Sequence, residues 1–221
     1  MKTALIIGAS GGIGAAVRTI LETQGISVTG LSRSLDGFDL TDPDHALQIL
    51  DGQAGPFDLI LVASGALEIE GAAPEKTIRA VSAKAMMDQF ALNTVGPALV
   101  LSRSHKLLPR KGRSVFAVLS ARVGSIGDNR MGGWISYRAA KAAVNQVVHT
   151  AAIELSRTHK QAICVALHPG TVKTAFTQKY LNRHPAVEPE DAAQNLLSVI
   201  SGLTPTDTGG FFDWAGHPVP W

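Results

Sequence analysis

The sequence contains almost no cysteine and little excess charge, and both shortages narrow the classes of protein to consider. Its single cysteine, Cys164, lies inside an apolar run and allows neither a disulfide nor a cysteine-based metal cluster. The formal net charge of +2 gives no electrostatic reason for binding nucleic acid. We therefore expect no metal site and no nucleic-acid partner.

Long apolar runs are missing as well. No stretch reaches the roughly 20 residues of a membrane-spanning helix, and the apolar start leads into a glycine turn rather than a signal-peptide cleavage site. We expect a cytoplasmic protein without a membrane partner. Its 221 residues, 45% hydrophobic and 17% charged, suffice for one domain with a sizeable core, which we expect to span residues 1–221.

Apolar runs and helical patterns alternate along the chain. The apolar runs are continuous, which is typical of parallel strands covered on both faces. The order predicts a doubly wound, mostly parallel α/β sheet, a Rossmann fold, with its ligand at the C-terminal ends of the strands. The long irregular segment 174–189 is either a lid over the site or an ordinary surface loop. The predicted strands are residues 3–7, 26–31, 59–63, 115–119 and 163–167, and a short one near 211–212.

A glycine-rich turn follows the first predicted strand and opens a helix. The common G-x-G-x-x-G spacing fails, because Val17 stands where its last glycine would be. G-x-x-x-G-x-G fits with Gly8, Gly12 and Gly14, and G-x-x-G-x-x-G is readable with Gly11. A turn of this kind presents backbone N–H groups and a helix N-terminus to a pyrophosphate. The turn therefore predicts a dinucleotide site.

Tyr137 and Lys141 stand four residues apart in a second helical pattern. At this spacing both side chains leave the same face of a helix, so an ammonium group can lie beside a phenol and favour its ionised form. Such a pair is equipped for acid and base chemistry. It gains weight from the dinucleotide turn at the start of the chain.

Taken together, these motifs resemble those of the short-chain dehydrogenase/reductase family. Tyr137 and Lys141 match its Y-x-x-x-K, Asn93 matches its helix asparagine, and residues 169–174 match its P-G-x-V-x-T segment. The stretch from Gly124 onward is similar to the subgroup named after the bacterial C-factor signalling protein. The resemblance covers nearly the whole chain.

The resemblance implies reversible hydride transfer between a nicotinamide cofactor and a small carbonyl compound or alcohol. Tyr137 would exchange the proton, while Lys141 would lower the pKa of the phenol and hold the ribose. Asn93 would hold a water that connects Lys141 to solvent, or tie helix to strand as a buried amide. A homodimer or homotetramer, paired through the helices carrying Asn93 and Tyr137, is also implied.

The family's catalytic serine has two candidate positions. Counting forward along the fourth long strand gives Ser120, whereas counting back from Gly124 gives Ala121. We favour Ser120, which could instead cap the strand end through a hydrogen bond. The family's N-N-A-G is also altered, because Val62-Ala63-Ser64-Gly65 stands in its place.

The residues after the second predicted strand favour NADP over NAD. An NAD enzyme of this fold typically has an acid there for the ribose 2′-hydroxyl, but no acid occurs before Asp36. Arg33 suits a 2′-phosphate, and Ser32 can add a hydrogen bond. Further on, Asp39 and Leu40 resemble the family's adenine contact.

These inferences together predict the residues of the site. The predicted catalytic residues are Tyr137, Lys141, Asn93 and Ser120. The predicted cofactor-binding residues are Gly8, Ser10, Gly11, Gly12, Ile13, Gly14, Ser32, Arg33, Asp39, Leu40, Ala63, Ser64, Gly65, Asn93, Tyr137, Lys141, Pro169, Gly170, Val172 and Thr174. The alternative function is an NAD(P)-binding signalling or regulatory protein of C-factor type with little turnover.

Overall fold

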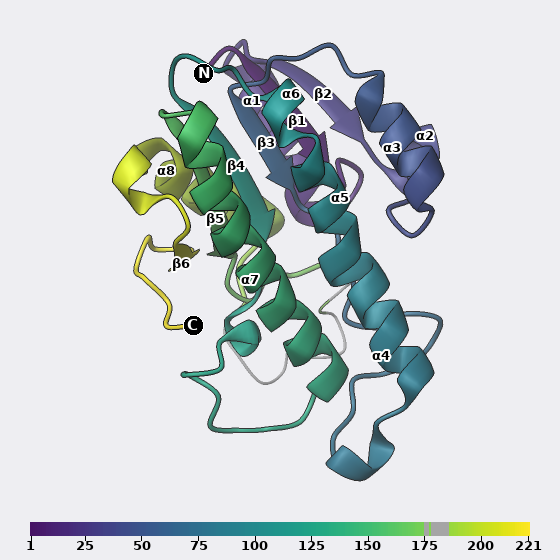
Figure 1. Ribbon diagram of the computed structural model, residues 1–221. Helices are drawn as coiled ribbons and strands as arrows, with labels where there is room; N and C mark the ends of the chain where they lie inside the picture. The colour runs from purple at the N-terminus through teal and green to yellow at the C-terminus, as the bar shows by residue number, and fades with distance from the viewer. Residues whose placement is uncertain (175–176, 178–185) are drawn as a thin grey trace.

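The computed structural model describes residues 1–174, 177 and 186–221. Its centre is a six-stranded sheet of order β2-β1-β3-β4-β5-β6, in which every neighbouring pair is parallel (Figure 1). This confirms the predicted doubly wound sheet. The strands are β1 (Thr3–Ile7), β2 (Ser27–Leu31), β3 (Leu59–Val62), β4 (Ser114–Leu119), β5 (Ala162–His168) and β6 (Phe211–Asp213).

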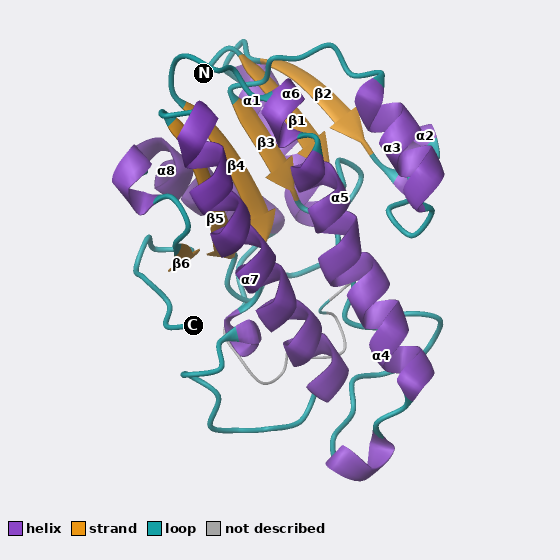
Figure 2. Ribbon diagram, in the orientation of Figure 1, coloured by secondary structure: helices purple, strands orange, loops and turns teal. Residues whose placement is uncertain are grey.

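Helices cover both faces of the sheet (Figure 2). One apolar cluster packs α1 and α8 on one face, and a second packs α3, α5 and α7 on the other. Because both faces are buried, strand residues of both parities are apolar, which accounts for the continuous runs in the sequence. The helices are α1 (Gly12–Thr23), α2 (Arg33–Asp36), α3 (Pro43–Asp51), α4 (Ala83–Phe90), α5 (Gly96–Ser102), α6 (Ser104–Leu107), α7 (Ile135–Thr158) and α8 (Pro189–Gly202), with short 3₁₀ turns at Ile78–Ala80, Arg122–Gly124 and Pro205–Asp207 and a π-helix at Ala91–Val95.

The strand order reverses between β1 and β3, and in open α/β sheets the ligand crevice lies at such a reversal, outside the carboxyl ends of the strands. In Figure 1 the loops that follow the strands gather at the lower end of the sheet, beside the beginnings of α4 and α7. Most of the predicted lid segment falls at 175–176 and 178–185, outside the described residues.

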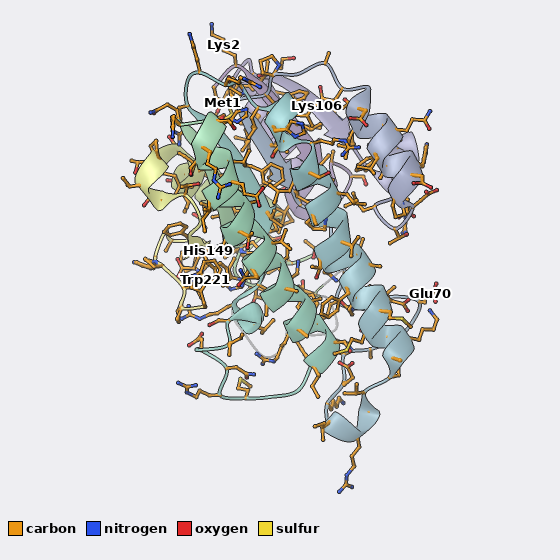
Figure 3. The ribbon with its side chains drawn as sticks, in the orientation of Figure 1. Met1, Lys2, Glu70, Lys106, His149 and Trp221 are labelled. Atoms are coloured by element: carbon orange, nitrogen blue, oxygen red, sulfur yellow. The ribbon has the colours of Figure 1, made fainter. Side chains whose placement is uncertain are left out.

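The last strand and the chain end pack against α7. Figure 3 shows Trp221 beside His149, with ring centroids 5.5 Å apart, and the indole also stacks on Phe211.

Cys164 is buried in the sheet, and burial raises the pKa of its thiol to about 12, as expected of an inert cysteine. No helix within the described residues is both long and apolar enough to cross a membrane.

Candidate active site

The glycine turn after β1 has no room for a side chain at Gly8 or Gly14. Gly8 has φ +85°, and a Cβ atom there would lie 2.8 Å from the backbone nitrogen of Ser64 after β3. A Cβ atom at Gly14 would overlap the carbonyl oxygen of Gly8. Glycine at both positions lets the turn fold tightly against the end of β3 and the start of α1.

The start of α1 has the features of an anion-binding site. All residues of this helix are among those that the structure describes. It begins after Gly11, with no side-chain cap and no acidic residue in its first turn. Its first N–H groups are therefore left for a ligand. A Cβ atom at Gly12 would lie 2.6 Å from Cγ2 of Thr174, so the predicted P-G-x-V-x-T segment reaches this turn. The arrangement fits the pyrophosphate of a dinucleotide.

The end of β2 lacks a free acid, as the sequence predicts. Ser32 is buried and caps α2 by accepting a hydrogen bond from the Leu35 N–H. Asp36, the first acid after the strand, accepts from the Ser32 N–H at 3.1 Å. Arg33 is exposed at the start of α2. Arg33 and Asp36 are both exposed here, but Asp36 is bonded to the backbone of its own turn, and Arg33 supplies the positive charge of this corner.

Two further contacts fix this corner. The Ser34 hydroxyl donates to the Ser10 hydroxyl at 2.9 Å, which joins α2 to the glycine turn. Asp39 accepts from the Thr41 hydroxyl and N–H, and these bonds, helped by the charge of Arg33, lower the pKa of its carboxyl. Both Ser10 and Asp39 belong to the predicted cofactor contacts.

Asn93 is completely buried within the π-helix between α4 and α5, a distortion frequent at functional sites. Its amide group donates to the Ala66 carbonyl at 2.9 Å and to the Gln89 side chain at 2.7 Å, and its oxygen accepts from the Ala66 N–H. These bonds tie the π-helix to the segment after β3. The predicted water-holding role stays a prediction.

Lys141 lies at the centre of the predicted residues. It is 3% exposed, and its ammonium group donates to the Leu119 carbonyl at 2.9 Å, at the end of β4. A Cβ atom at Gly65 would lie 3.5 Å from Nζ of Lys141 and 2.8 Å from Oδ1 of Asn93. The structure thus brings the ends of β3 and β4, the π-helix and α7 together around one cation.

Tyr137 lies beside this cation. Nζ of Lys141 is 5.8 Å from the centroid of its ring. Burial raises the pKa of the Tyr137 phenol and lowers the pKa of Lys141 to about 8, because each charged form loses water. In this state burial outweighs the expected effect of the ammonium group on the phenol. The neutral phenol is the form that can donate a proton.

The Ser120 hydroxyl, which is predicted to bind the substrate oxygen, is bonded to another side chain in this structure. It donates to Oδ1 of Asn145 at 2.6 Å, and the side chain is 4% exposed. Asn145 lies about 12 Å further along α7 than Tyr137, at about 1.5 Å per residue. Ala121 is partly exposed, and its side chain points to the opposite face from that of Ser120. Counting back from Gly124 places the family's serine at Ala121.

Sequence reasoning missed a second group of polar residues beside Tyr137. Glu75 and Ser136 are buried and bonded to each other, and Gln89 holds both Asn93 and the Leu67 carbonyl. Gln89 stands four residues before Asn93, so helix spacing could have paired them. A partner for Glu75 sixty-one residues along the chain leaves no such local signal.

The comparisons with known proteins agree with this geometry. The sequence profile of the short chain dehydrogenase family matches residues 37–184, well over half of the chain. The chain belongs to the short chain dehydrogenase family. It is therefore an oxidoreductase of this type, as its resemblance to the family implies.

Several family members are similar over long stretches. A 1-hydroxy-2-glutathionyl-2-methyl-3-butene dehydrogenase of Rhodococcus sp. is 27% identical over 237 residues, covering 100% of both chains. The C-signal of Myxococcus xanthus is 33% identical over 62% of this chain and 78% of its own. An NADPH-bound carbonyl reductase from chicken fatty liver superposes with TM-score 0.81 at 22% identity, covering 100% of this chain and 94% of the reductase.

Proposed function

We propose that the protein transfers hydride between NADPH and a small carbonyl compound, an aldehyde, a ketone or a similar molecule. The observation that carries the proposal is the convergence of Tyr137, Lys141 and Asn93 at the ends of β3 and β4, next to a glycine turn that fits a pyrophosphate. When bound, NADPH supplies the hydride. The chain supplies the binding surface and the proton.

Tyr137 is the proposed proton donor to the substrate oxygen. Its buried phenol is neutral at physiological pH, so it can donate as negative charge develops on that oxygen. Lys141, held by the Leu119 carbonyl, stabilises the phenolate left behind. With a pKa of about 8 it still carries its charge near neutral pH and can pass on a proton. Asn93 fixes the surrounding segments.

Selection of NADPH over NADH rests on the end of β2. Arg33 offers a planar, multiply donating group for a 2′-phosphate. Asp36, the nearest acid along the chain, lies four residues beyond Ser32, and one of its oxygens accepts from the Ser32 N–H, so no acid follows the strand directly. The NADPH-bound carbonyl reductase of the same fold is consistent with this choice.

The test is a screen of NADPH oxidation against aldehydes, ketones, quinones and pterins. The wild-type protein should oxidise NADPH with at least one class, and the same screen with NADH should be slower. Protein denatured and removed before the assay provides the blank. Cofactor binding measured by fluorescence with no turnover on any class would contradict the proposal.

A dinucleotide-binding signalling protein of C-factor type is the second candidate. Two observations favour it: the similarity to the C-signal, and the hydrogen bond of the Ser120 hydroxyl to Asn145, since Ala121, the other candidate for the family's serine, has no hydroxyl. Retention of Tyr137 and Lys141 favours the enzyme, because a binding protein needs no proton donor. The screen separates the two.

We also propose that the protein is a homodimer or homotetramer in the cytoplasm. Apolar side chains stand exposed on the helices that carry Asn93 and Tyr137 and on the adjoining α4, namely Val95 in the π-helix, Ile153 on α7 and Met87 on α4. Light scattering should give a mass at least twice 23.2 kDa. A monomer at micromolar concentration would contradict this assembly.

A further inference from the structure

We propose that Glu75 is a positioning residue, whose carboxylate holds the first turn of α7 and thereby sets the phenol of Tyr137 in place for proton transfer. This inference rests on the proposed function, in which Tyr137 is the proton donor. It assigns a task to a buried acid in the otherwise irregular segment between β3 and α4.

Three hydrogen bonds join Glu75 to the start of α7. One carboxylate oxygen accepts from the Ser136 N–H at 3.2 Å, and the other accepts from the Ser136 hydroxyl. Its backbone carbonyl accepts from the Trp134 N–H at 2.6 Å. Glu75 is 7% exposed and Ser136 is buried, so these bonds are shielded from water.

The carboxylate replaces the cap that α7 lacks. The residue before the helix is Trp134, which provides no side-chain cap, and the N–H groups of a first helical turn need acceptors. A negative charge is also favoured beside the positive end of the helix dipole. Ser136, which is bonded to Glu75, directly precedes Tyr137, so these bonds hold the helical turn that carries the phenol.

The backbone before α7 adopts a rare conformation that makes these bonds possible. Gly132, Gly133 and Trp134 all have positive φ, at +65°, +67° and +53°. Residues other than glycine seldom adopt this region, and such outliers concentrate at functional sites. The turn brings the N–H groups of Trp134 and Ser136 to Glu75. It also sets the indole edge-on to the Tyr137 ring, with centroids 6.4 Å apart.

Because the side chains around Glu75 are closely packed, the position of its carboxylate affects the position of the Tyr137 phenol. Glu75, Ser136, Tyr137, Leu67 and Gln89 line one cavity of only about 10 Å³, about the space of one water. A displaced carboxylate would therefore displace its neighbours. Nearer the solvent the same segment is fastened to α4, since Glu70, at the outer edge in Figure 3, forms an ion pair with Lys84.

Four variants separate positioning from simple helix capping. Glu75→Ala removes the carboxylate, and Ser136→Ala removes the hydroxyl it binds. Glu75→Gln is the conservative rescue, because its oxygen can accept from the Ser136 N–H while its NH₂ donates to the Ser136 hydroxyl. Ser82→Ala is the matched control, since Ser82 caps α4 by accepting from the Ala85 N–H and has no contact with α7 among the bonds described.

Three measurements are made on each variant. The chain has only two tyrosines, so ¹³C-labelled tyrosine gives two ring signals, and Tyr137→Phe assigns them. Steady-state kinetics on the best carbonyl substrate then give kcat and KM, and fluorescence gives NADPH affinity. Glu75→Ala should shift the Tyr137 signal and lower kcat by roughly 10- to 100-fold, with NADPH affinity unchanged.

The rescue and the control sharpen the expected result. Glu75→Gln should restore both the Tyr137 signal and kcat, and Ser82→Ala should change neither. Adding Ser136→Ala to Glu75→Ala should cause little further loss, because both remove one interaction. An unchanged Tyr137 signal or an unchanged kcat in folded Glu75→Ala would overturn the proposal. Absence of turnover in the wild type would contradict the proposed function instead, and the tyrosine signal would then decide the role of Glu75.

Discussion

The cofactor half of the site and the catalytic half are held together by different chemistry. Around Gly8 and Gly14 the structure is made of backbone atoms in close contact, and Gly12 is packed against the side chain of Thr174, so none of the three positions has room for a Cβ atom. Around Tyr137 it is made of buried polar side chains, with Glu75 bonded to the start of α7 and Lys141 bonded to the end of β4. In the proposed function the first half presents N–H groups to the cofactor, and the second half supplies the proton.

This difference sets how each half should respond to mutation. A backbone cradle tolerates no added volume, so a single methyl group should disturb it. A network of buried polar groups is sensitive in addition to the loss of a partner, because a stranded polar group costs free energy. Substitutions in the two halves should therefore separate cofactor binding from turnover.

The largest expected effect is on the catalytic half. Tyr137→Phe removes the proton donor and little volume, so carbonyl reduction should fall by a factor of roughly 100 or more. NADPH affinity, followed by cofactor fluorescence, should stay close to that of the wild type. An undiminished rate on the best substrate would show that another group delivers the proton.

Arg33→Ala should weaken NADPH binding by roughly 10- to 100-fold, because a charge-assisted bond to the 2′-phosphate is lost. NADH binding should hardly change. Arg110→Ala is the matched control, since Arg110 is exposed just before the start of β4, at the opposite end of the sheet. Equal affinity of the wild type for both cofactors would remove the basis of the NADP assignment.

Gly14→Ala tests the backbone cradle. The added methyl group would overlap the Gly8 carbonyl, so unfolding free energy should fall by about 1–3 kcal/mol and NADPH binding should weaken as the turn shifts. Gly202→Ala, at the end of α8 with nothing near its Cβ position, should leave both unchanged. Thermal unfolding and cofactor titration measure the pair. A Gly14→Ala protein as stable as the control would argue against a tight cradle.

The smallest expected effect is at Ser120. Ser120→Ala strands the Asn145 oxygen and should cost about 1–2 kcal/mol of stability, while kcat falls by less than about 10-fold, below the usual cost of losing an oxyanion donor. Ala121→Ser places a hydroxyl at the other candidate position and should raise kcat. A larger loss in Ser120→Ala would restore Ser120 to the reacting centre.

The contrast also explains what the sequence could predict. Continuous apolar runs mark the strands of a covered parallel sheet, and glycines mark the turn after β1, so both are readable locally. Tyr137 and Lys141 are readable because one helical turn joins them. The partners of Ser120 and Glu75 are not, because Asn145 and Ser136 come from other elements and meet them only after the sheet and helices have packed.

The direct test of the central claim is to follow the hydride itself. NADPH carrying deuterium at the transferred position of the nicotinamide is incubated with the protein and its best carbonyl substrate, and the alcohol is analysed by mass spectrometry and NMR. We expect one deuterium on the carbinol carbon with the wild type, and in the same time at most about one hundredth of that with Tyr137→Phe. NADPH bound by the wild type, with no deuterium delivered to any compound of the panel, would contradict the claim and identify a dinucleotide-binding protein.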